Sequence, residues 1–388
     1  MSAYPSSKYS VELANPAGQV LAELGGRAAN RSFTVTRNAA DDIEWYLNID
    51  EIEKYCHKTY TDPRTIFVTN QTNVRIKRLG QYFAAGQLNY KYGTLAENSS
   101  GNLLQIKAAG FYNLLTTAFT GPGQTYTATD ASAIAWDLIN TFQTGGNDTT
   151  GTLNTTTGKY SGGLVPTSYW NLGITQGSLA TVGNHDRVYN NMALSDALTD
   201  FANTNAGSFD FKFDYLNRFN TYTILGSQRP DILFEYPGNI IEVDAIEDGT
   251  QVFNQIIAQG SGNGTTAQNI WTAPNPVTGT PAAASMQAYG VRQQYVSPSS
   301  LDVGDSSLQD YANWNLALYQ SPLVLPSIII DGSKPPYITD FSMGDWVHVR
   351  VRNHPLYNDI NGMYRVEQVK VQIDDNDFEQ VTITTSLN

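Results

Sequence analysis

Two pairs of acidic residues are the first candidates for chemistry in this chain. Asp41 lies next to Asp42, and Glu51 is two residues from Glu53. Paired carboxylates can act as acid and base in glycoside hydrolysis, where the distance between them decides the reaction. Positions in a sequence do not set that distance. We therefore interpret the four carboxylates as chance neighbours rather than as a catalytic site.

The residues that commonly bind metals form no recognisable site. The only cysteine, Cys56, excludes an intramolecular disulfide and a cysteine zinc cluster. Asp374, Asp375 and Asp377 have the one-residue spacing of calcium loops, but the distal Gly and Glu of an EF-hand are missing. We expect a polar hairpin tip there, and whether an ion binds the Asp374–Asp377 turn stays open. The histidines are scattered, with no second ligand at metal-binding spacing: His57, His185, His348 and His354.

Known catalytic and phosphate-binding motifs are also missing from the sequence. The run Gly260–Gly264 (GSGNG) lacks the lysine and the helix that follow a phosphate-binding loop, so it predicts a flexible loop. Nucleophile-elbow, zinc-protease, kinase and paired-cysteine motifs do not occur. The sequence therefore predicts a protein that is not an enzyme, with no catalytic residue, no metal ligand and no cofactor.

The charge of the chain argues against two classes of partner. Lys and Arg number 23 against 36 Asp and Glu, a net charge of −13. Sequence-specific nucleic-acid binding and adhesion to anionic membranes need basic surface. The cluster Arg75, Lys77 and Arg78 alternates with apolar residues, and we expect it on the solvent-facing side of a strand. No export signal or membrane-length apolar run is present, so we predict no membrane insertion and folding in a reducing cytoplasm.

Alternating apolar and polar residues predict strands at both ends of the chain. Val74 and Ile76 alternate with Arg75 and Lys77 ahead of a glycine-containing turn, which indicates a half-buried hairpin. The segment FDFKFDYL (Phe209–Tyr215 and Leu216) has aromatic residues at every second position, which favours a core-facing strand over a binding groove. Further strands are expected at Ser32–Thr36, Asp42–Ile49, Leu103–Ala109, 347–351, 369–373 and 381–383.

Helices are expected between these strand-rich segments. Thr129 or Asp130 is a suitable N-cap for a helix whose apolar face includes Ile134 and Leu138. Residues 144–165 and Gly260–Thr280 are rich in Gly, Thr, Asn or Pro and are predicted to be loops. The other expected helices are Asp50–His57, Ser195–Asn203 and Ser307–Tyr319.

The order of these elements predicts a mainly β fold with α+β insertions. We expect two small β-barrel domains joined by helix-containing segments. The predicted divisions are a first barrel part (1–115), a helical insertion (116–205), a β segment completing or flanking that barrel (206–260), a loop and helix connector (261–320) and a C-terminal barrel (321–388).

Several segments, taken in order, resemble the tail-hub proteins found at the baseplate or tail tip of tailed phages. FAAGQLN (Phe83–Asn89) is similar to the family's turn and following strand, and GFYNLL (Gly110–Leu115) is similar to its step from strand to helix. DASAIAWDLI (Asp130–Ile139) resembles its helix before a long loop. The closing likeness is MGDWVHVRV and INGMYRVEQVKVQIDDNDFEQVTIT within Met343–Thr384; two more are the helix–strand step in Leu194–Phe211 and FNQIIAQGSG (Phe253–Gly262).

The resemblance implies a structural role. Proteins of this family form trimeric rings of paired barrels around the tube lumen, which implies a homotrimer that leaves a channel for DNA. It further implies contacts with a distal tail protein, a tape measure protein, and tail fibre or tip proteins, in a virion assembled in the host cytoplasm. Two alternatives stay open: a receptor- or carbohydrate-binding adhesion module, and a hydrolase of cell-wall polymer.

Overall fold

The computed structural model describes most of the chain. The described residues are 8–24, 31–48, 62–93, 103–202, 209–250, 252–259, 270–274, 278–296, 305–320, 323–353, 355, 360–374 and 378–386. The expected helix Asp50–His57 and the run Gly260–Gly264 lie outside them. Within them the fold is mainly β, as predicted, and a 13-stranded sheet dominates it. None of the described helices is long and apolar enough to cross a membrane.

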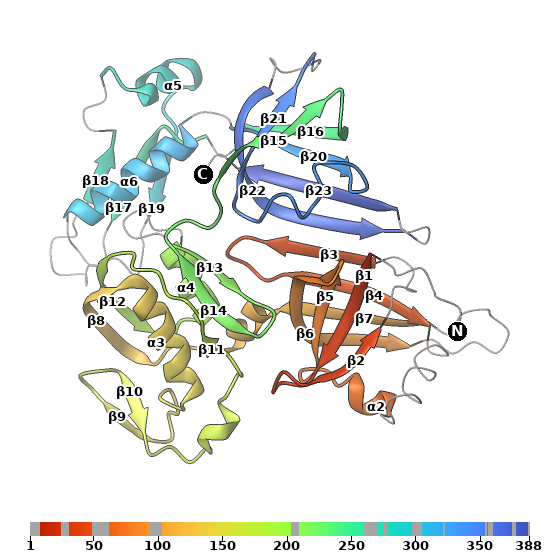
Figure 1. Cartoon of the computed structure of the whole chain (residues 1–388). Coiled ribbons are helices and arrows are strands. Elements are labelled where there is room, and N and C mark those ends of the chain that lie inside the picture. The colour runs from red at the N-terminus through yellow and green to blue at the C-terminus, as the bar shows by residue number, and fades with distance from the viewer. Residues whose placement is uncertain are drawn as a thin grey trace, which may run out of the picture.

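The N-terminal strands form one end of the large sheet, which we call the N-terminal strand unit (Figure 1). Its strands lie in the order β3-β4-β7-β6-β5-β1-β2. The predicted hairpin is confirmed, because β5 and β6 pair antiparallel. The elements are β1 (Tyr9–Ala14), β2 (Val20–Leu24), β3 (Arg31–Thr36), β4 (Asp42–Asn48), α2 (Pro63–Ile66), β5 (Asn73–Arg78), β6 (Gln81–Gly93) and β7 (Leu103–Gly110).

The C-terminal strand unit forms the other end of the sheet. Valines at 347, 349 and 351 are buried while their neighbours are half-buried, which confirms the predicted alternation. Two strands from the middle of the chain complete the unit, since β15 pairs parallel with β21 and β16 pairs antiparallel with β20. Its strands are β15 (Gln228–Tyr236), β16 (Ile240–Asp248), β20 (Leu323–Asp331), β21 (Trp346–Val351), β22 (Ile360–Ile373) and β23 (Glu379–Ser386).

The two strand units repeat one arrangement. In each, a long strand of 13 or 14 residues (β6, β22) lies between a six-residue strand (β5, β21) and an eight-residue strand (β7, β23). The long strand pairs antiparallel with both neighbours and has a register shift against the eight-residue strand. The chain therefore contains two strand units built alike. Their closure into barrels and the bounds of the five predicted divisions stay predictions.

A ladder between β22 and β3 joins the two units into one sheet. Val369 lies opposite Val35 and Val371 opposite Phe33, and all four side chains are buried. Figure 1 shows β3 lying along the C-terminal unit. Side chains from both units form one continuous hydrophobic core. Burial of apolar area stabilises a fold by about 25 cal/mol per Å², so this shared core couples the two units.

An insertion between β7 and β15 has its own core. The predicted helix is α3, and Asp130 caps it by accepting hydrogen bonds from the amides of Ser132 and Ala133 at 3.0 and 3.4 Å. A short hairpin, β9–β10, lies within the predicted loop 144–165. The elements are η1 (Phe111–Thr117), β8 (Pro122–Asp130), α3 (Ala131–Gln143), β9 (Thr152–Asn154), β10 (Lys159–Ser161), η2 (Thr167–Tyr169), β11 (Thr175–Gln176), β12 (Asn184–Asn190), α4 (Leu194–Ala202), β13 (Asp210–Phe213) and β14 (Arg218–Tyr222).

The aromatic strand in this insertion packs into its core, as predicted. Phe209 and Phe211 are 1% and 2% exposed and lie beside Phe219 of β14. The strand is shorter than expected, however, because β13 ends at Phe213. Tyr215 lies in the turn that follows and stacks on Tyr82 of β6, with ring centroids 3.8 Å apart. Phe209 and Phe211 therefore pack in the insertion core, whereas Tyr215 contacts the N-terminal strand unit.

A small unit between β16 and β20 completes the fold. Three strands in the order β18-β17-β19 are covered by α6, and Ile256, Ala258 and Leu316 contribute to a separate core. The predicted helix Ser307–Tyr319 is confirmed as α6, whereas β18 lies in a stretch predicted to be loop. The elements are β17 (Gln255–Gln259), β18 (Ile270–Ala273), α5 (Pro281–Tyr289), β19 (Gln293–Val296) and α6 (Asp305–Tyr319).

Candidate functional site

Several hydrogen bonds and ion pairs meet at the place where both strand units contact the insertion, which we call the junction. It is centred on Asp210, at the start of β13. Two glycines allow the chain to approach closely there: Gly226 has a φ of +89°, and a Cβ on it would lie 2.1 Å from the carbonyl carbon of Gly344. Gly344 has a φ of +85°. Since L side chains rarely adopt this conformation, glycine is required at both positions.

Asp210 binds groups from all three parts. Arg37, which follows β3, donates from Nη1 to Oδ1, and Arg365 of β22 donates from Nη2 to Oδ2, both at 2.5 Å. The amide of Leu225 donates to Oδ2 at 2.7 Å. Burial alone would raise the pKa of Asp210, but the Leu225 amide and the two guanidinium groups hold it below its ordinary value. The carboxylate is therefore charged and holds the three parts together.

A second buried ion pair links the ends of the large sheet. The side chain of Glu379, from β23, is fully buried and accepts hydrogen bonds from Arg78 Nη2 at 3.0 Å and Tyr9 Oη at 2.6 Å. Burial and the Glu379 charge raise the pKa of Tyr9, which keeps its hydroxyl protonated as a donor. The three residues come from β5, β23 and β1. This cluster thus joins the N-terminal and C-terminal units on their core side.

The prediction of a solvent-facing basic strand was wrong. Arg75 and Arg78 are each 3% exposed, and Lys77 is largely buried. Arg75 and Lys77 pair with Glu12 of β1 at 2.8 and 2.6 Å. Alternation in the sequence identified two faces of β5 but not what covers them. The outer face is covered by Glu12 and the stacked tyrosine rings, and the inner face carries Arg78 into the shared core.

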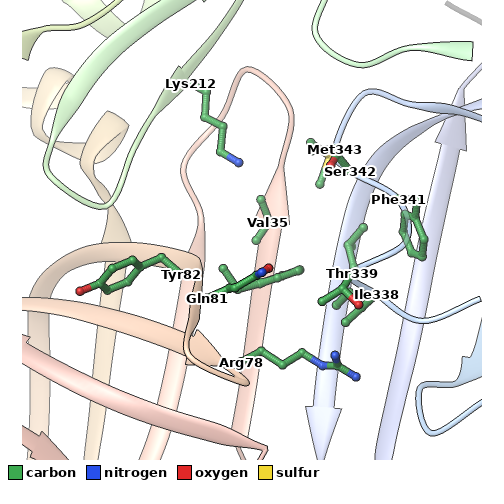
Figure 2. Close-up of a pocket in the computed structure, with 12 residues that line it drawn as sticks. Val35, Arg78, Gln81, Tyr82, Lys212, Ile338, Thr339, Phe341, Ser342 and Met343 are labelled. Carbon is green, nitrogen blue, oxygen red and sulfur yellow. The ribbon is translucent and has the colours of Figure 1, made fainter.

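A cavity of about 180 Å³ lies between the two strand units beside the junction (Figure 2). Its inner wall is apolar, with Val35, Val369 and Phe341 among the buried lining residues. Lys212 of β13 extends into it from the insertion side, as Figure 2 shows. Gln81 and Ser342 are exposed and lie at its mouth. The cavity therefore combines an apolar inner wall with polar lining residues, among them the cations Arg78 and Lys212.

Only one of the two acidic pairs, Asp41 and Asp42, lies among the described residues. Asp41 is partly buried just before β4 and accepts a hydrogen bond from the Thr36 amide at 3.4 Å, whereas Asp42 is exposed on the strand itself. Neighbouring residues of a strand project to opposite sides, so the two carboxylates do not converge. Glu51 and Glu53 lie outside the described residues. Burial raises the pKa of Asp41 from 3.8 to about 7, against the opposing effect of the Lys212 charge.

We expect the stability of the protein to respond to the ionisation of Asp41. Its folded-state pKa lies above its unfolded value, so the folded state retains a proton that the unfolded state has released. Stability from this group is present below about pH 4 and is lost as the pH rises to about 7. Asp41→Asn removes this loss, and above pH 7 it should raise the free energy of unfolding by on the order of 1–3 kcal/mol relative to wild type.

Urea denaturation at several pH values measures this effect. The exposed Asp42→Asn variant is the matched control, and its difference from wild type should stay near zero at every pH. If Asp41→Asn shifts stability by the same amount at pH 4 and above pH 7, the assignment of a raised pKa is wrong.

Two of the four histidines, His185 and His348, lie among the described residues. His348 lies on the half-buried side of β21 and forms a hydrogen bond between Nε2 and Asn361 Oδ1 at 2.7 Å, in keeping with its expected structural role. Burial lowers the pKa of His185 on β12. Asp374 accepts a bond from the Phe378 amide at 2.8 Å. Among the described residues no three His, Cys, Asp or Glu side chains group as metal ligands. Cys56, His57, His354, Asp375 and Asp377 lie outside the described residues.

Three solved structures share this architecture over nearly the whole chain. The 43 kDa tail protein of prophage MuSo2 from Shewanella oneidensis matches with a TM-score of 0.61 at 10% identity, over 97% of this chain and 98% of that one. A tail protein from Neisseria meningitidis MC58 gives 0.59 at 12% identity, over 97% and 96%. The chain has a tail-protein fold. Prophage tail protein gp18 from Listeria monocytogenes EGD-e also matches, with 0.53 at 12% identity over 97% and 94%.

The resemblance predicted from the sequence is thus confirmed for the fold. Neither a family model nor a curated protein sequence matches the chain. The tail-protein fold extends over both strand units, the insertion and the small unit, because nearly all of this chain and of each matched chain is covered.

Sequence reasoning missed the acidic residue at the centre of each buried ion cluster, Asp210 at the junction and Glu379 between the two strand units. Asp210 alternates with buried phenylalanines, and this pattern placed it on a polar side without indicating a partner. Glu379 lies five residues after Asp374, and only the Asp374–Asp377 turn was considered as a possible ion site. A signal was available in both cases: a single acid beside buried apolar residues, with unassigned arginines elsewhere in the chain. The identity of the partners could not be predicted from spacing.

Proposed function

We propose that this chain is a structural hub subunit of a phage tail tip or baseplate. Three copies close into a ring that joins the distal end of the tail tube to tip proteins and fibres, and the ring leaves a channel for DNA. The tail-protein fold supports a structural role in a tail. The distal tail protein, the tape measure protein and the fibre or tip proteins are the proposed partners, in a virion assembled in the host cytoplasm.

One observation carries the proposal: two strand units of like build are fused into one sheet by the β22–β3 ladder. A trimer of such chains presents six similar units around its axis, which suits a connection between a six-fold tube and a three-fold tip. In a closed symmetric ring, every copy also makes the same contacts with its neighbours. The net charge of −13 disfavours adhesion of DNA to the channel wall. The proposed role needs no catalytic residue.

Sedimentation equilibrium and negative-stain microscopy of the purified chain test the ring. We expect a species of three times the 42.6 kDa chain mass, seen as a three-fold ring with a central opening. Gold-labelled antibody against the chain should mark the tail tip of intact virions. A particle of single-chain mass at all concentrations, without an opening, would contradict the proposal.

A second candidate function has one observation in its favour. Tyr90 and Tyr92 of β6 are 44% and 57% exposed. Tyr46 of β4, two strands away, lies on the same face of the sheet. Gln105 lies between Tyr46 and Tyr92 and donates to the Tyr46 hydroxyl at 2.8 Å. Exposed aromatic rings with fixed polar neighbours are suited to carbohydrate binding, which favours an adhesion module. A glycan array on the purified protein tests this, and the absence of any hit would exclude it.

A further inference from the structure

The cavity beside the junction is large enough for a small organic molecule. Its volume of about 180 Å³ exceeds that of the engineered apolar cavity of 150 Å³ that takes up benzene. Buried side chains of both strand units form its inner wall, including Val35 from β3, Val369 from β22, and Ile338 and Phe341 from the chain between β20 and β21. The body of a ligand bound there would be apolar and about the size of one ring.

The charged groups around this cavity are paired, with one exception. Arg78 bonds to Glu379, and Arg37 and Arg365 bond to Asp210. Among the described residues, no carboxylate oxygen lies within 4.0 Å of Lys212 Nζ, and no side chain forms a hydrogen bond with it. The charge of Lys212 acts on Asp41, whose pKa it lowers against the larger effect of burial. Lys212 is therefore a half-buried cation that has no ion pair within 4.0 Å among the described residues.

We propose that this cavity binds a small carboxylate with an apolar, ring-sized body, whose carboxylate pairs with Lys212. A cation held away from bulk water gains more from an anionic partner than an exposed one does. Lys212 extends from the insertion while the apolar wall belongs to the strand units (Figure 2). A bound carboxylate would thus contact all three parts and stabilise their arrangement. This site is separate from ring formation and does not depend on it.

Benzoate is the probe, because it combines one carboxylate with a body the size of benzene. Calorimetric titration of the full chain at neutral pH should show saturable binding of benzoate. Benzyl alcohol, which has the same ring but no charge, should bind about tenfold more weakly or worse. Benzoate should also raise the Tm in a concentration-dependent way. No saturable binding, or equal binding of benzoate and benzyl alcohol, overturns the proposal.

Two variants locate the charge contact. Lys212→Met should reduce benzoate affinity by about tenfold or more, whereas Lys212→Arg should retain it. The exposed Lys334→Met variant is the control, because Lys334 lies between β20 and β21 but does not line the cavity, and it should bind as wild type does. Unchanged benzoate binding by Lys212→Met contradicts the proposal. If that variant does not fold, the comparison of benzoate with benzyl alcohol on wild type still decides it.

Discussion

Replacing Asp210 with alanine is expected to lower the free energy of unfolding by about 3–5 kcal/mol, the usual effect of removing one partner from a buried ion pair. Arg37 and Arg365 would lose their shared carboxylate, and the Leu225 amide would lose its acceptor. Both guanidinium groups are largely shielded from water, with 18% and 6% of their side chains exposed. Water therefore cannot replace the lost contacts fully.

Urea denaturation at neutral pH measures the effect of Asp210→Ala. Asp231→Ala is the matched control, because the side chain of Asp231 is 61% exposed and pairs with Arg229. Such surface pairs contribute about 0–1 kcal/mol, so the control should change little. Equal shifts in the two variants would show that Asp210 does not hold the junction together.

Replacing Glu379 with glutamine is expected to have an effect of similar size, about 3–5 kcal/mol. The amide keeps the shape of the side chain but removes the charge that compensates Arg78, which is 3% exposed. The Tyr9 hydroxyl would also lose a charged acceptor at 2.6 Å. Because these groups belong to both strand units, the loss should appear as destabilisation of the whole sheet.

A double variant separates the lost charge pairing from a packing defect. Arg78→Met combined with Glu379→Gln removes the uncompensated guanidinium, so it should recover a large part of the stability lost by Glu379→Gln alone. Lys334→Ala, at a pair in which Lys334 is 71% exposed, is the surface control. If the double variant is no more stable than Glu379→Gln, the charge on Arg78 is not the cause of the loss.

Two buried ion clusters connect the parts of this chain. One links the insertion to both strand units through Asp210, and the other links β1, β5 and β23 through Glu379. Together with the β22–β3 ladder they hold the parts of one chain in a single arrangement. A ring subunit that transmits force between a tube and its tip needs such rigidity, in accord with the proposed function.

Local patterns predicted many elements of this fold from the sequence alone. The alternation of Val74 and Ile76 with basic residues indicated β5, and Asp130 followed by an apolar helical stripe indicated the start of α3. These predictions succeeded because side-chain periodicity and N-capping act over a few residues. The mainly β class followed from the same patterns. Strands β18 and β19 were missed because they are short and lie within polar, loop-like sequence.

The tertiary structure alone decided how distant segments meet. It placed Arg78 on Glu379, some 300 residues away, and brought Arg37 to Asp210. It also assigned β15 and β16, which precede the small unit, to the C-terminal strand unit. Periodicity reports which sides of a strand differ but not what covers each side, since that depends on the pairing of strands far apart in the chain. The sequence thus determined the elements and their class, and the packing of those elements determined the junction, its buried charges and the cavity beside it.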